Sequence, residues 1–428
     1  MSKKNRCFLS AILLCAIPVT AQVNTGSPYS RFGLGELSKP GFAYNLALGG
    51  TGIGLRTNNQ INYMNPASYS AIDTMSFLFD FGLQGSQTTY IQNSLESEMI
   101  NYNIHHIAVG FGITKNWKAS IGVVPYSSVG YNIVRTELLA DALFLNYNYM
   151  GNGGLNRFFI GNSVRFFNHF SLGLNLGYIF GNLNYTNSID FPATSNAANT
   201  VNETSLNIRD MIYDFGFQYH NTFGDKFFVT LGAVYNNETK LKTLQTIVQT
   251  SYFPGTKPNL DSIIIDPAFA INSDSLHGET LFPRNMGIGV SFGIKNKLMF
   301  AGDFSSQDWS KSLIPGKNDS LVNSNSINFG LEYTPNDQAL RGYYNRIHYR
   351  FGGYYSNTYL RIREEQLQDY GMSFGVGLPF RNTKSSFNLG FIVGQRGTTK
   401  NNLIKESYGM VNFGLTFHDF WFFKRKFD

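Results

Sequence analysis

The chain has 428 residues, of which 34 are basic and 28 acidic, while glycine (43), phenylalanine (38) and tyrosine (25) are abundant. Charged residues make up only 14% of the chain, and no basic block alternates with aromatic residues, which argues against a nucleic-acid-binding protein. Both cysteines, Cys7 and Cys15, lie in the N-terminal leader, so the mature chain has neither a disulfide nor a cysteine ligand for a metal.

Residues 1–21 have the pattern of a secretory signal peptide. Three basic residues precede the apolar run 7–19, which is followed by Thr20 and Ala21. The run is shorter than the roughly 20 residues that a membrane-spanning helix needs, so we expect cleavage after Ala21 rather than an uncleaved anchor. Removal of the three leader cations from a total charge of +6 leaves a mature chain, starting at Gln22, with a net charge of about +3.

Residues 22–74 precede any clear strand and contain a glycine cluster at 49–54 and the triplet Asn65-Pro66-Ala67. Glycine and proline at this density are typical of a compact irregular segment, and one of this size could be buried inside a barrel as a plug. The glycine cluster lacks the Lys-Ser/Thr that would follow in a phosphate-binding loop, so we interpret it as a site of close backbone packing.

From residue 75 onward, apolar residues alternate with small or polar residues in fourteen segments. In residues 286–294, for example, Met286, Ile288 and Val290 fall on one face of a strand. Alternation with period two, apolar on one face only, suits a wall between lipid and a polar lumen. The predicted strands are 75–91, 101–114, 116–134, 156–167, 170–190, 206–221, 226–249, 281–295, 297–311, 322–335, 346–357, 369–380, 386–397 and 408–418.

The links between these strands alternate in length. Short links, such as 115–116 and 168–169, alternate with longer ones, such as 135–155, 191–205 and 250–280. Outer-membrane barrels alternate short periplasmic turns with long external loops, whereas a soluble β-sandwich has no reason to do so. The sequence therefore predicts an all-β fold, a 14-stranded antiparallel transmembrane β-barrel with an N-terminal plug, in the outer membrane of a Gram-negative bacterium. Its predicted divisions are a signal peptide 1–21, a hatch 22–74, a barrel 75–418 and a C-terminal tail 419–428.

Side-chain parity assigns a face to each residue of a strand. Arg157, Arg165 and Arg350 fall on the inward face, as expected because an arginine facing lipid at mid-bilayer would cost about 2–4 kcal/mol. These arginines could hold the carboxylate of a ligand. Pairing with lumen acids such as Asp303 or Glu332 is the favoured interpretation, because buried charges are usually paired.

The motifs in these segments resemble the FadL family of outer-membrane transporters for long-chain fatty acids and other hydrophobic compounds. The glycine cluster 49–54, followed by Asn65-Pro66-Ala67, looks like the N-terminal hatch of that family. Residues 283–289 are similar to its eighth strand, residues 301–310 to its ninth and residues 350–354 to a later strand. The resemblance runs over nearly the whole mature chain, and the fourteen strands of the family match the number predicted here.

The resemblance implies that a hydrophobic compound, such as a long-chain fatty acid, passes the hatch and leaves sideways into the outer-membrane lipid. The exit would lie beside a kink in the third strand, where a proline without an amide hydrogen interrupts the ladder. Insertion of such a barrel would involve the barrel-assembly machinery. The residues that would gate passage are Gly50, Gly52, Gly54, Asn65, Pro66 and Ala67 in the hatch. The residues that would form the exit are Pro125, Tyr126 and Gly130.

A second function stays open, in which a barrel of this kind is an accessory or binding factor for protein secretion or surface attachment and transports nothing. No cofactor or metal is expected, because the histidines are scattered and His105 and His106 are predicted on opposite faces of a strand. The segment 289–293 matches the Gly-x-Ser-x-Gly pattern of serine hydrolases around Ser291, but it lies inside a strand rather than at a strand-turn-helix elbow. We therefore expect no enzyme activity.

Overall fold

The computed structural model describes residues 25–139, 143–192, 197–224, 226–253, 270–317, 319–339, 341–381 and 383–420. The predicted signal peptide lies outside the described residues, as do residues 254–269 of the predicted long loop and residues 421–428 of the predicted tail. None of the helices in the described part of the chain is long and apolar enough to cross a membrane.

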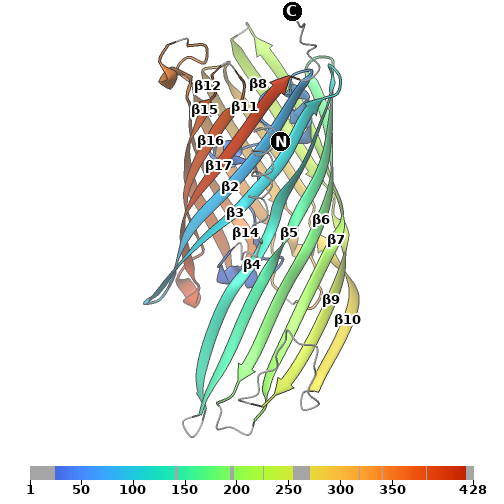
Figure 1. The fold of residues 1–428 in the computed structure, drawn as a ribbon, viewed down its shortest axis with the longest axis vertical. Helices are drawn as coiled ribbons and strands as arrows, with labels where there is room; N and C mark the ends of the chain where they lie inside the picture. Colours follow the sequence, from blue (N-terminus) through green and yellow to red (C-terminus); the bar gives the residue numbers. More distant parts are fainter. Residues whose placement is uncertain are drawn as a thin grey trace, which may run out of the picture.

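The chain forms a closed antiparallel β-barrel, and the predicted number of fourteen wall strands is confirmed (Figure 1). Two of the fourteen are interrupted, because β8 (Phe227–Asn236) continues as β9 (Thr239–Tyr252), and β10 (Ala270–Phe282) continues as β11 (Asn285–Ile294). Pro283, which has no amide hydrogen for the ladder, lies in the second interruption. The other wall strands are β2 (Ser76–Gln92), β3 (Leu95–Gly112), β4 (Trp117–Leu139), β5 (Leu143–Phe166), β6 (Phe170–Asp190), β7 (Asn199–Phe223), β12 (Leu298–Gln307), β13 (Ser324–Tyr333), β14 (His348–Ile362), β15 (Glu365–Pro379), β16 (Ser386–Arg396) and β17 (Lys405–Phe420).

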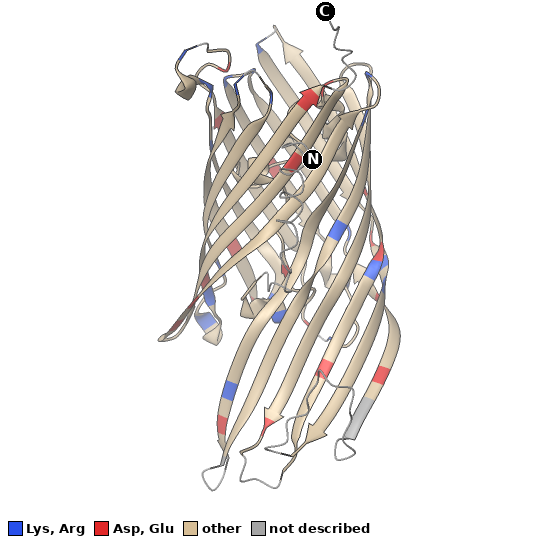
Figure 2. Cartoon of the chain, in the orientation of Figure 1, with Lys and Arg blue, Asp and Glu red and all other residues tan. Residues whose placement is uncertain are grey.

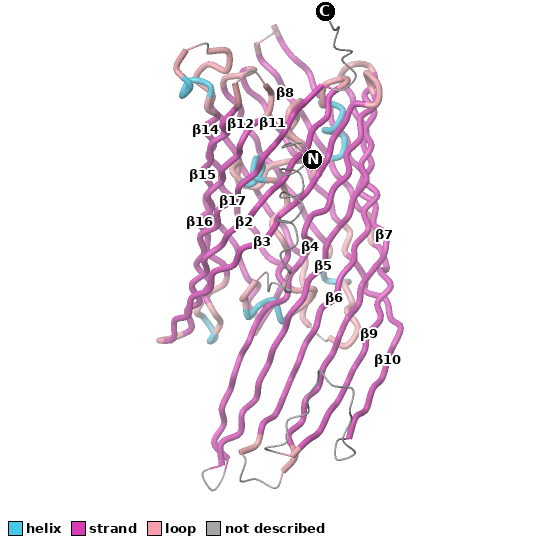
Figure 3. Tube along the Cα trace, in the orientation of Figure 1, coloured by secondary structure: helices cyan, strands magenta, loops and turns pink. Residues whose placement is uncertain are grey.

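The wall is much taller on one side than on the other. Strands β4 to β7 have 21 to 25 residues, whereas β12 and β13 have 10 each, and about 9–11 residues suffice to cross a membrane. The long strands project at the end of the barrel opposite the short turns (Figures 1 and 3). The predicted loops 135–155 and 191–205 were therefore wrong, since most of their residues extend these strands. Outside the membrane both faces of a strand can be polar, so the alternation that identifies a strand is lost there.

The outer face of the wall is apolar, as parity predicted. Phe300 and Leu172 are about half exposed on it, whereas the inward Asp303 and Arg350 are buried. Charged side chains are sparse along most of the wall and gather near its ends (Figure 2). Such a distribution fits a lipid-facing surface, which tolerates few charges.

Residues 25–74 form the hatch, which packs against the inner face of the wall. Its short elements are η1 (Pro28–Arg31), β1 (Glu36–Leu37), α2 (Ala43–Leu46) and η2 (Pro66–Ala71). Leu34, Leu48 and Ala67 of the hatch are fully buried. In the loops outside the hatch lie η4 (Trp309–Lys311), η5 (Tyr343–Arg346) and η6 (Lys400–Asn402).

The lumen contains a large apolar cluster beside the hatch. Leu34 of the hatch packs there with inward residues of the tall wall, including Leu155, Ile179 and Leu206, and with the fully buried Trp309. This part of the lumen is therefore apolar, whereas the sequence pattern had indicated a polar lumen throughout.

Candidate ligand cavity and lateral opening

Glycines on both the hatch and the wall let the two backbones touch. A Cβ placed on Gly54 would lie 2.6 Å from the amide nitrogen of Val290 on β11, and one on Gly49 would lie 2.6 Å from the amide nitrogen of Gly353 on β14. Gly49 also has a φ of +70°, a conformation that other residues rarely adopt. The inward glycines of the wall thus mark the seat of the hatch, and the glycine cluster 49–54 serves close packing.

The glycine cluster also binds a carboxylate from the wall. Asp303 of β12 accepts hydrogen bonds from the amides of Gly52 at 2.6 Å, Ile53 at 2.8 Å and Gly54 at 3.3 Å. Successive backbone amides that converge in this way form an anion-binding nest. Here the anion is part of the barrel, so the nest fastens the hatch to the wall.

Asp303→Asn is expected to loosen the hatch, because hydrogen bonds to a charged group contribute about 1.5–3 kcal/mol and the neutral amide weakens them. Liposomes carrying the variant barrel should swell faster in small solutes than liposomes carrying the wild type. Asp308→Asn is the matched control, since Asp308 pairs only with the half-exposed Arg284. Equal swelling rates for the two variants would show that the nest does not hold the hatch.

Asn65, Pro66 and Ala67 anchor the hatch on the opposite side of the lumen. The Asn65 side chain accepts from the amide of Ala67 at 3.0 Å, and it donates to the carbonyl oxygens of Ile53 at 2.8 Å and Phe217 at 3.2 Å. A Cβ on the inward Gly173 would overlap the backbone of Pro66 and Ala67. The triplet is therefore fixed against β6 and β7.

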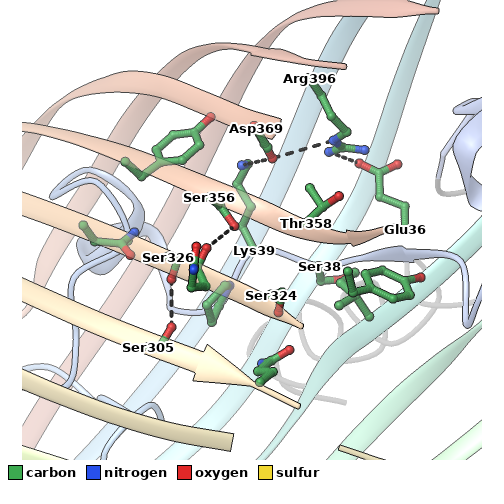
Figure 4. Close-up of a pocket in the computed structure, with 18 of the residues that line it drawn as sticks. Glu36, Ser38, Lys39, Ser305, Ser324, Ser326, Ser356, Thr358, Asp369 and Arg396 are labelled. Atoms are coloured by element: carbon green, nitrogen blue, oxygen red, sulfur yellow. Dashed lines mark hydrogen bonds and ion pairs between the residues drawn. The ribbon is translucent and has the colours of Figure 1, made fainter. Parts of the chain in front are cut away.

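A cavity of about 230 Å³ lies between the hatch and the inner face of β12 to β16 (Figure 4). One side of it is a row of hydroxyl groups on three adjacent strands, in which Ser305 faces Ser326 and Ser326 faces Ser356. The other side is apolar. Its main apolar residues are Leu46, Ile53, Leu360, Leu367 and Ile392.

A network of buried charges closes the cavity beside β1 (Figure 4). Lys39 pairs with Asp369 at 2.9 Å, and Arg396 pairs with Glu36 at 2.6 Å. Arg396 also lies 3.4 Å from Glu406 and 3.6 Å from Asp369, its cross-strand neighbours. Burial raises the pKa of Glu36, but the Arg396 guanidinium lowers it further than that, so Glu36 stays ionised. Burial likewise lowers the pKa of Lys39, but Asp369 raises it above its usual value.

The β1 segment separates this cavity from a second one of about 60 Å³. Glu36 and Lys39 line both cavities. The second cavity extends to Gln84 of β2, Asn101 of β3 and Ser128 of β4. The hatch segment from Glu36 to Lys39 is thus the partition between the lumen cavity and the wall at β3 and β4.

The hydrogen-bond ladder between β3 and β4 is short. It has only six residue pairs, from Gly112 and Lys118 to Ile107 and Val123. Beyond Val123 the hatch takes the place of β3, because Glu36 and Leu37 of β1 pair with β4 at Ser128 and Ser127.

Both strands are irregular where their ladder stops. The register of β4 against β5 shifts between Pro125 and Ser127, so the irregularity expected at the third-strand proline is present. Tyr126 accepts a hydrogen bond at its carbonyl oxygen from the amide of Ser38 at 2.9 Å, and Gly130 donates its amide to Ser30 at 3.0 Å. The three residues predicted for the exit therefore lie on the edge of β4 that the hatch covers.

The prediction that His105 and His106 point to opposite faces was wrong. A bulge in β3 at this point turns both inward, where they are buried and their Nδ1 atoms lie 3.0 Å apart. His106 Nε2 also lies 2.7 Å from Asp80. A sequence signal exists, because the apolar positions change from even numbers up to Ile104 to odd numbers from Ile107.

The three arginines predicted as ligand anchors lie away from the 230 Å³ cavity, which none of them lines. Arg157 pairs with Asp214, and Arg350 pairs with Glu332 at 2.7 Å. Arg165 has no carboxylate within ion-pair distance in the described part of the chain, but burial and its repulsion lower the pKa of Arg56 to about 10. The two paired arginines therefore have no free charge to offer a ligand.

Arg350→Ala is expected to destabilise the folded barrel by about 3–5 kcal/mol, because it leaves the buried Glu332 carboxylate without its partner. Urea unfolding of the barrel in lipid vesicles measures this loss. Arg361→Ala is the matched control, since its pair with Glu364 is exposed and should contribute no more than about 1 kcal/mol. A ligand anchor without a structural role would instead show unchanged unfolding.

Ser291, the serine of the Gly-x-Ser-x-Gly match, faces the hatch from inside β11. Its hydroxyl donates to the carbonyl oxygen of Gly54 at 2.7 Å. Among the described residues, no group of three or more histidine, cysteine, aspartate or glutamate side chains could hold a metal ion. The contact of Ser291 is a further point at which the hatch is fastened.

Several solved outer-membrane barrels share this fold. The Pseudomonas putida toluene transporter TodX is 15% identical, with a TM-score of 0.59 over 90% of this chain and 99% of the other. The Ralstonia pickettii toluene transporter TbuX is 13% identical, with a TM-score of 0.57 over 88% and 98%. A Pseudomonas aeruginosa FadL homologue is 12% identical, with a TM-score of 0.57 over 90% and 99%. No curated protein sequence matches the chain.

The closed wall of fourteen strands and these structures define an outer-membrane β-barrel with the FadL fold, so the resemblance seen in the sequence is confirmed. The family is narrower than that fold. The chain belongs to the BamG family, whose model matches residues 1–428.

Proposed function

We propose that the protein takes up hydrophobic compounds from outside the cell and releases them sideways into the outer membrane between β3 and β4. The observation that carries this proposal is the early end of the β3–β4 ladder, next to a cavity that only the β1 segment separates from the lumen. The apolar cluster around Leu34 and Trp309 gives the outer part of the lumen the character that such compounds need. The solved barrels with this fold include proteins named as toluene transporters.

In this proposal only part of the hatch moves. Asn65, Pro66 and Ala67 act as a fixed anchor, as do Gly50, Gly52 and Gly54, because their contacts with the wall are backbone contacts and buried hydrogen bonds. The β1 segment is the gate, because two residue pairs and a set of side-chain ion pairs hold it. Pro125, Tyr126 and Gly130 form the edge that the gate covers.

The class of compound is proposed more coarsely than the sequence suggested. A long-chain fatty acid remains a prediction, and the size of the cavity counts against it, because about 230 Å³ is below the roughly 300–1,000 Å³ of pockets for drug-sized ligands. No catalytic step is part of the proposal.

Uptake of labelled toluene, octane and oleate by cells that lack the gene tests this function. Complementation with the wild-type chain should restore uptake of at least one of the three compounds by about tenfold, as expected when a barrel replaces slow permeation through the outer membrane. Cells complemented with Glu36→Gln, which loses the ion pair to Arg396, should take up the same compound faster still. Equal uptake of all three by deleted and complemented cells would contradict the proposal.

A second candidate function is favoured by the family name and by the same edge of the wall. The prefix of the name BamG is that of the barrel-assembly machinery, which is also the partner expected from the sequence. Residues 124–139 of β4 have β5 on one side and only the two residues of β1 on the other, and unpaired strand edges are templates for adding another strand. The barrel would then be an accessory factor that docks a partner.

Purification from outer membranes separates the two functions. An accessory factor should be recovered in a fixed ratio with the assembly machinery, and its deletion should lower the amounts of other outer-membrane barrels. A transporter should be recovered alone, and its deletion should leave those amounts unchanged.

A further inference from the structure

We propose that the 230 Å³ cavity binds a neutral amphiphile, a molecule with a hydroxyl- or amide-rich head and a short apolar tail, and not a carboxylate. This inference rests on the proposed function, since it names the class of compound that the cavity selects. Three properties of the cavity support it: its balance of charges, its row of hydroxyl groups and its apolar side (Figure 4).

The charge balance of the cavity disfavours an anion. Its ionised side chains are two cations, Lys39 and Arg396, and three carboxylates, Glu36, Asp303 and Asp369. Both cations already pair with these carboxylates, and Arg396 also pairs with Glu406 just outside. A carboxylate entering the cavity would meet an excess of negative charge and would be desolvated without a partner, which is costly.

The backbone nest beside the cavity offers an anion no site either. Its amides at Gly52, Ile53 and Gly54 all donate to Asp303. A ligand carboxylate would have to displace Asp303 and leave that buried side chain unpaired. The two features that usually bind anions, cationic side chains and converging amides, are therefore both occupied by the protein.

The hydroxyl row has hydrogen-bonding capacity left for a neutral head. The Ser305 and Ser326 hydroxyls bond one another at 2.8 Å, and the Ser356 hydroxyl donates to the carbonyl oxygen of Asn325 at 3.2 Å. Each hydroxyl can donate once and accept twice, so acceptor positions remain on this side of the cavity. The amide of Gln307 and the hydroxyl of Ser324 lie beside the row and add donors.

The opposite side of the cavity can take a short apolar tail. Leu46 of the hatch, Leu367 of β15 and Ile392 of β16 face the cavity and are buried. The hydroxyl side and this apolar side together make an amphipathic site, whereas a site for toluene or an alkane would not need the hydroxyl row. The small volume limits the ligand to a head and a short tail.

Three ligands with the same eight-carbon tail test the inference: 1-octanoylglycerol, octanoate and octane. Binding of each labelled ligand to the full chain in lipid nanodiscs is measured, with empty nanodiscs subtracted. 1-Octanoylglycerol should bind saturably and at least about tenfold more tightly than either of the others, because only it satisfies both sides of the site. Tighter or equal binding of octanoate or octane would overturn the inference while leaving the proposed function in place. Binding of none of the three would count against the proposed function itself.

Two variants with opposite expected effects sharpen the test. Ser326→Val with Ser356→Val should weaken binding of 1-octanoylglycerol about tenfold by removing two hydrogen-bonding groups, and should leave octane unaffected. Ser407→Val is the matched control, since this serine lies outside the cavity. Asp369→Asn removes the carboxylate partner of Lys39 and should strengthen octanoate binding at least about fivefold. An unchanged octanoate affinity in that variant would contradict the argument from charge balance.

Discussion

Gly352→Val is expected to unseat the hatch and to let small solutes cross the barrel at least about tenfold faster than in the wild type, because a close-packed contact between two backbones cannot relax by a change of rotamer. A Cβ on Gly352 would overlap the amide nitrogen of Gly49 and the carbonyl carbon of Leu48. Both atoms belong to the backbone of the hatch, which Asp303 and Asn65 also hold. The hatch must therefore move away from β14 as a whole.

Liposome swelling with a series of sugars of increasing size measures this permeability. Gly409→Val is the matched control, because a Cβ there meets nothing within 4 Å. Cold SDS electrophoresis before and after heating should show that both variants remain folded barrels. Swelling rates equal to those of the control would mean that β14 is not the seat of the hatch.

The wall of the barrel could be predicted from the sequence because lipid imposes one rule on every strand that crosses it. Residues 286–294 show apolar side chains at every second position, and β11 (Asn285–Ile294) forms there. The number of strands and the inward arginines follow from the same rule. Where the strands leave the membrane the rule stops, so β5 was predicted to begin at residue 156, although it begins at Leu143.

The gate could not be predicted, because it depends on which strands lie side by side and on what the hatch brings to them. Asp369, Arg396 and Glu406 are far apart in the sequence, yet they occupy one row across β15, β16 and β17. Glu36 reaches that row only because the hatch folds back beside β4. None of these four residues lies in a motif, and each alone looks like an ordinary lumen charge.

The lateral opening shows an intermediate case. Pro125 indicated an irregular third strand, and the register of β4 does shift there. The matching bulge at His105 was missed, although the phase of the apolar residues changes at that point. Two bulges on facing strands, and not the proline alone, bring the β3–β4 ladder to an end.

A disulfide between β1 and β4 is expected to stop uptake through the proposed exit. In Leu37→Cys with Ser127→Cys, the two cysteines replace residues that face each other across the β1–β4 ladder. The amide of Ser38 donates to the carbonyl oxygen of Tyr126, so the next pair along, Leu37 and Ser127, is of the non-hydrogen-bonded kind. Such pairs have Cα atoms about 4.5 Å apart, which lies within the range that a disulfide spans.

The covalent bond would fix the gate in the position that the structure shows, whereas the wild-type gate is held only by hydrogen bonds and ion pairs. Oxidised cells should lose at least about 90% of the uptake that the wild-type chain restores, and a reductant should return it, since a disulfide is reversible. Because both native cysteines lie in the predicted leader, no other thiol of the mature chain competes for the new pair.

The control is a second disulfide that closes no path. Thr246→Cys with Ser275→Cys joins β9 to β10, which already pair along the wall, and both native side chains are exposed. It should leave uptake unchanged under oxidising and reducing conditions. If the β1–β4 disulfide forms and uptake continues, the compound leaves by another route and the gate does not lie between β3 and β4. If both disulfides stop uptake, the effect comes from stiffening the barrel and not from closing the gate. Loss of uptake in the β1–β4 pair alone would assign the exit to the edge of β4 that Glu36 and Leu37 cover.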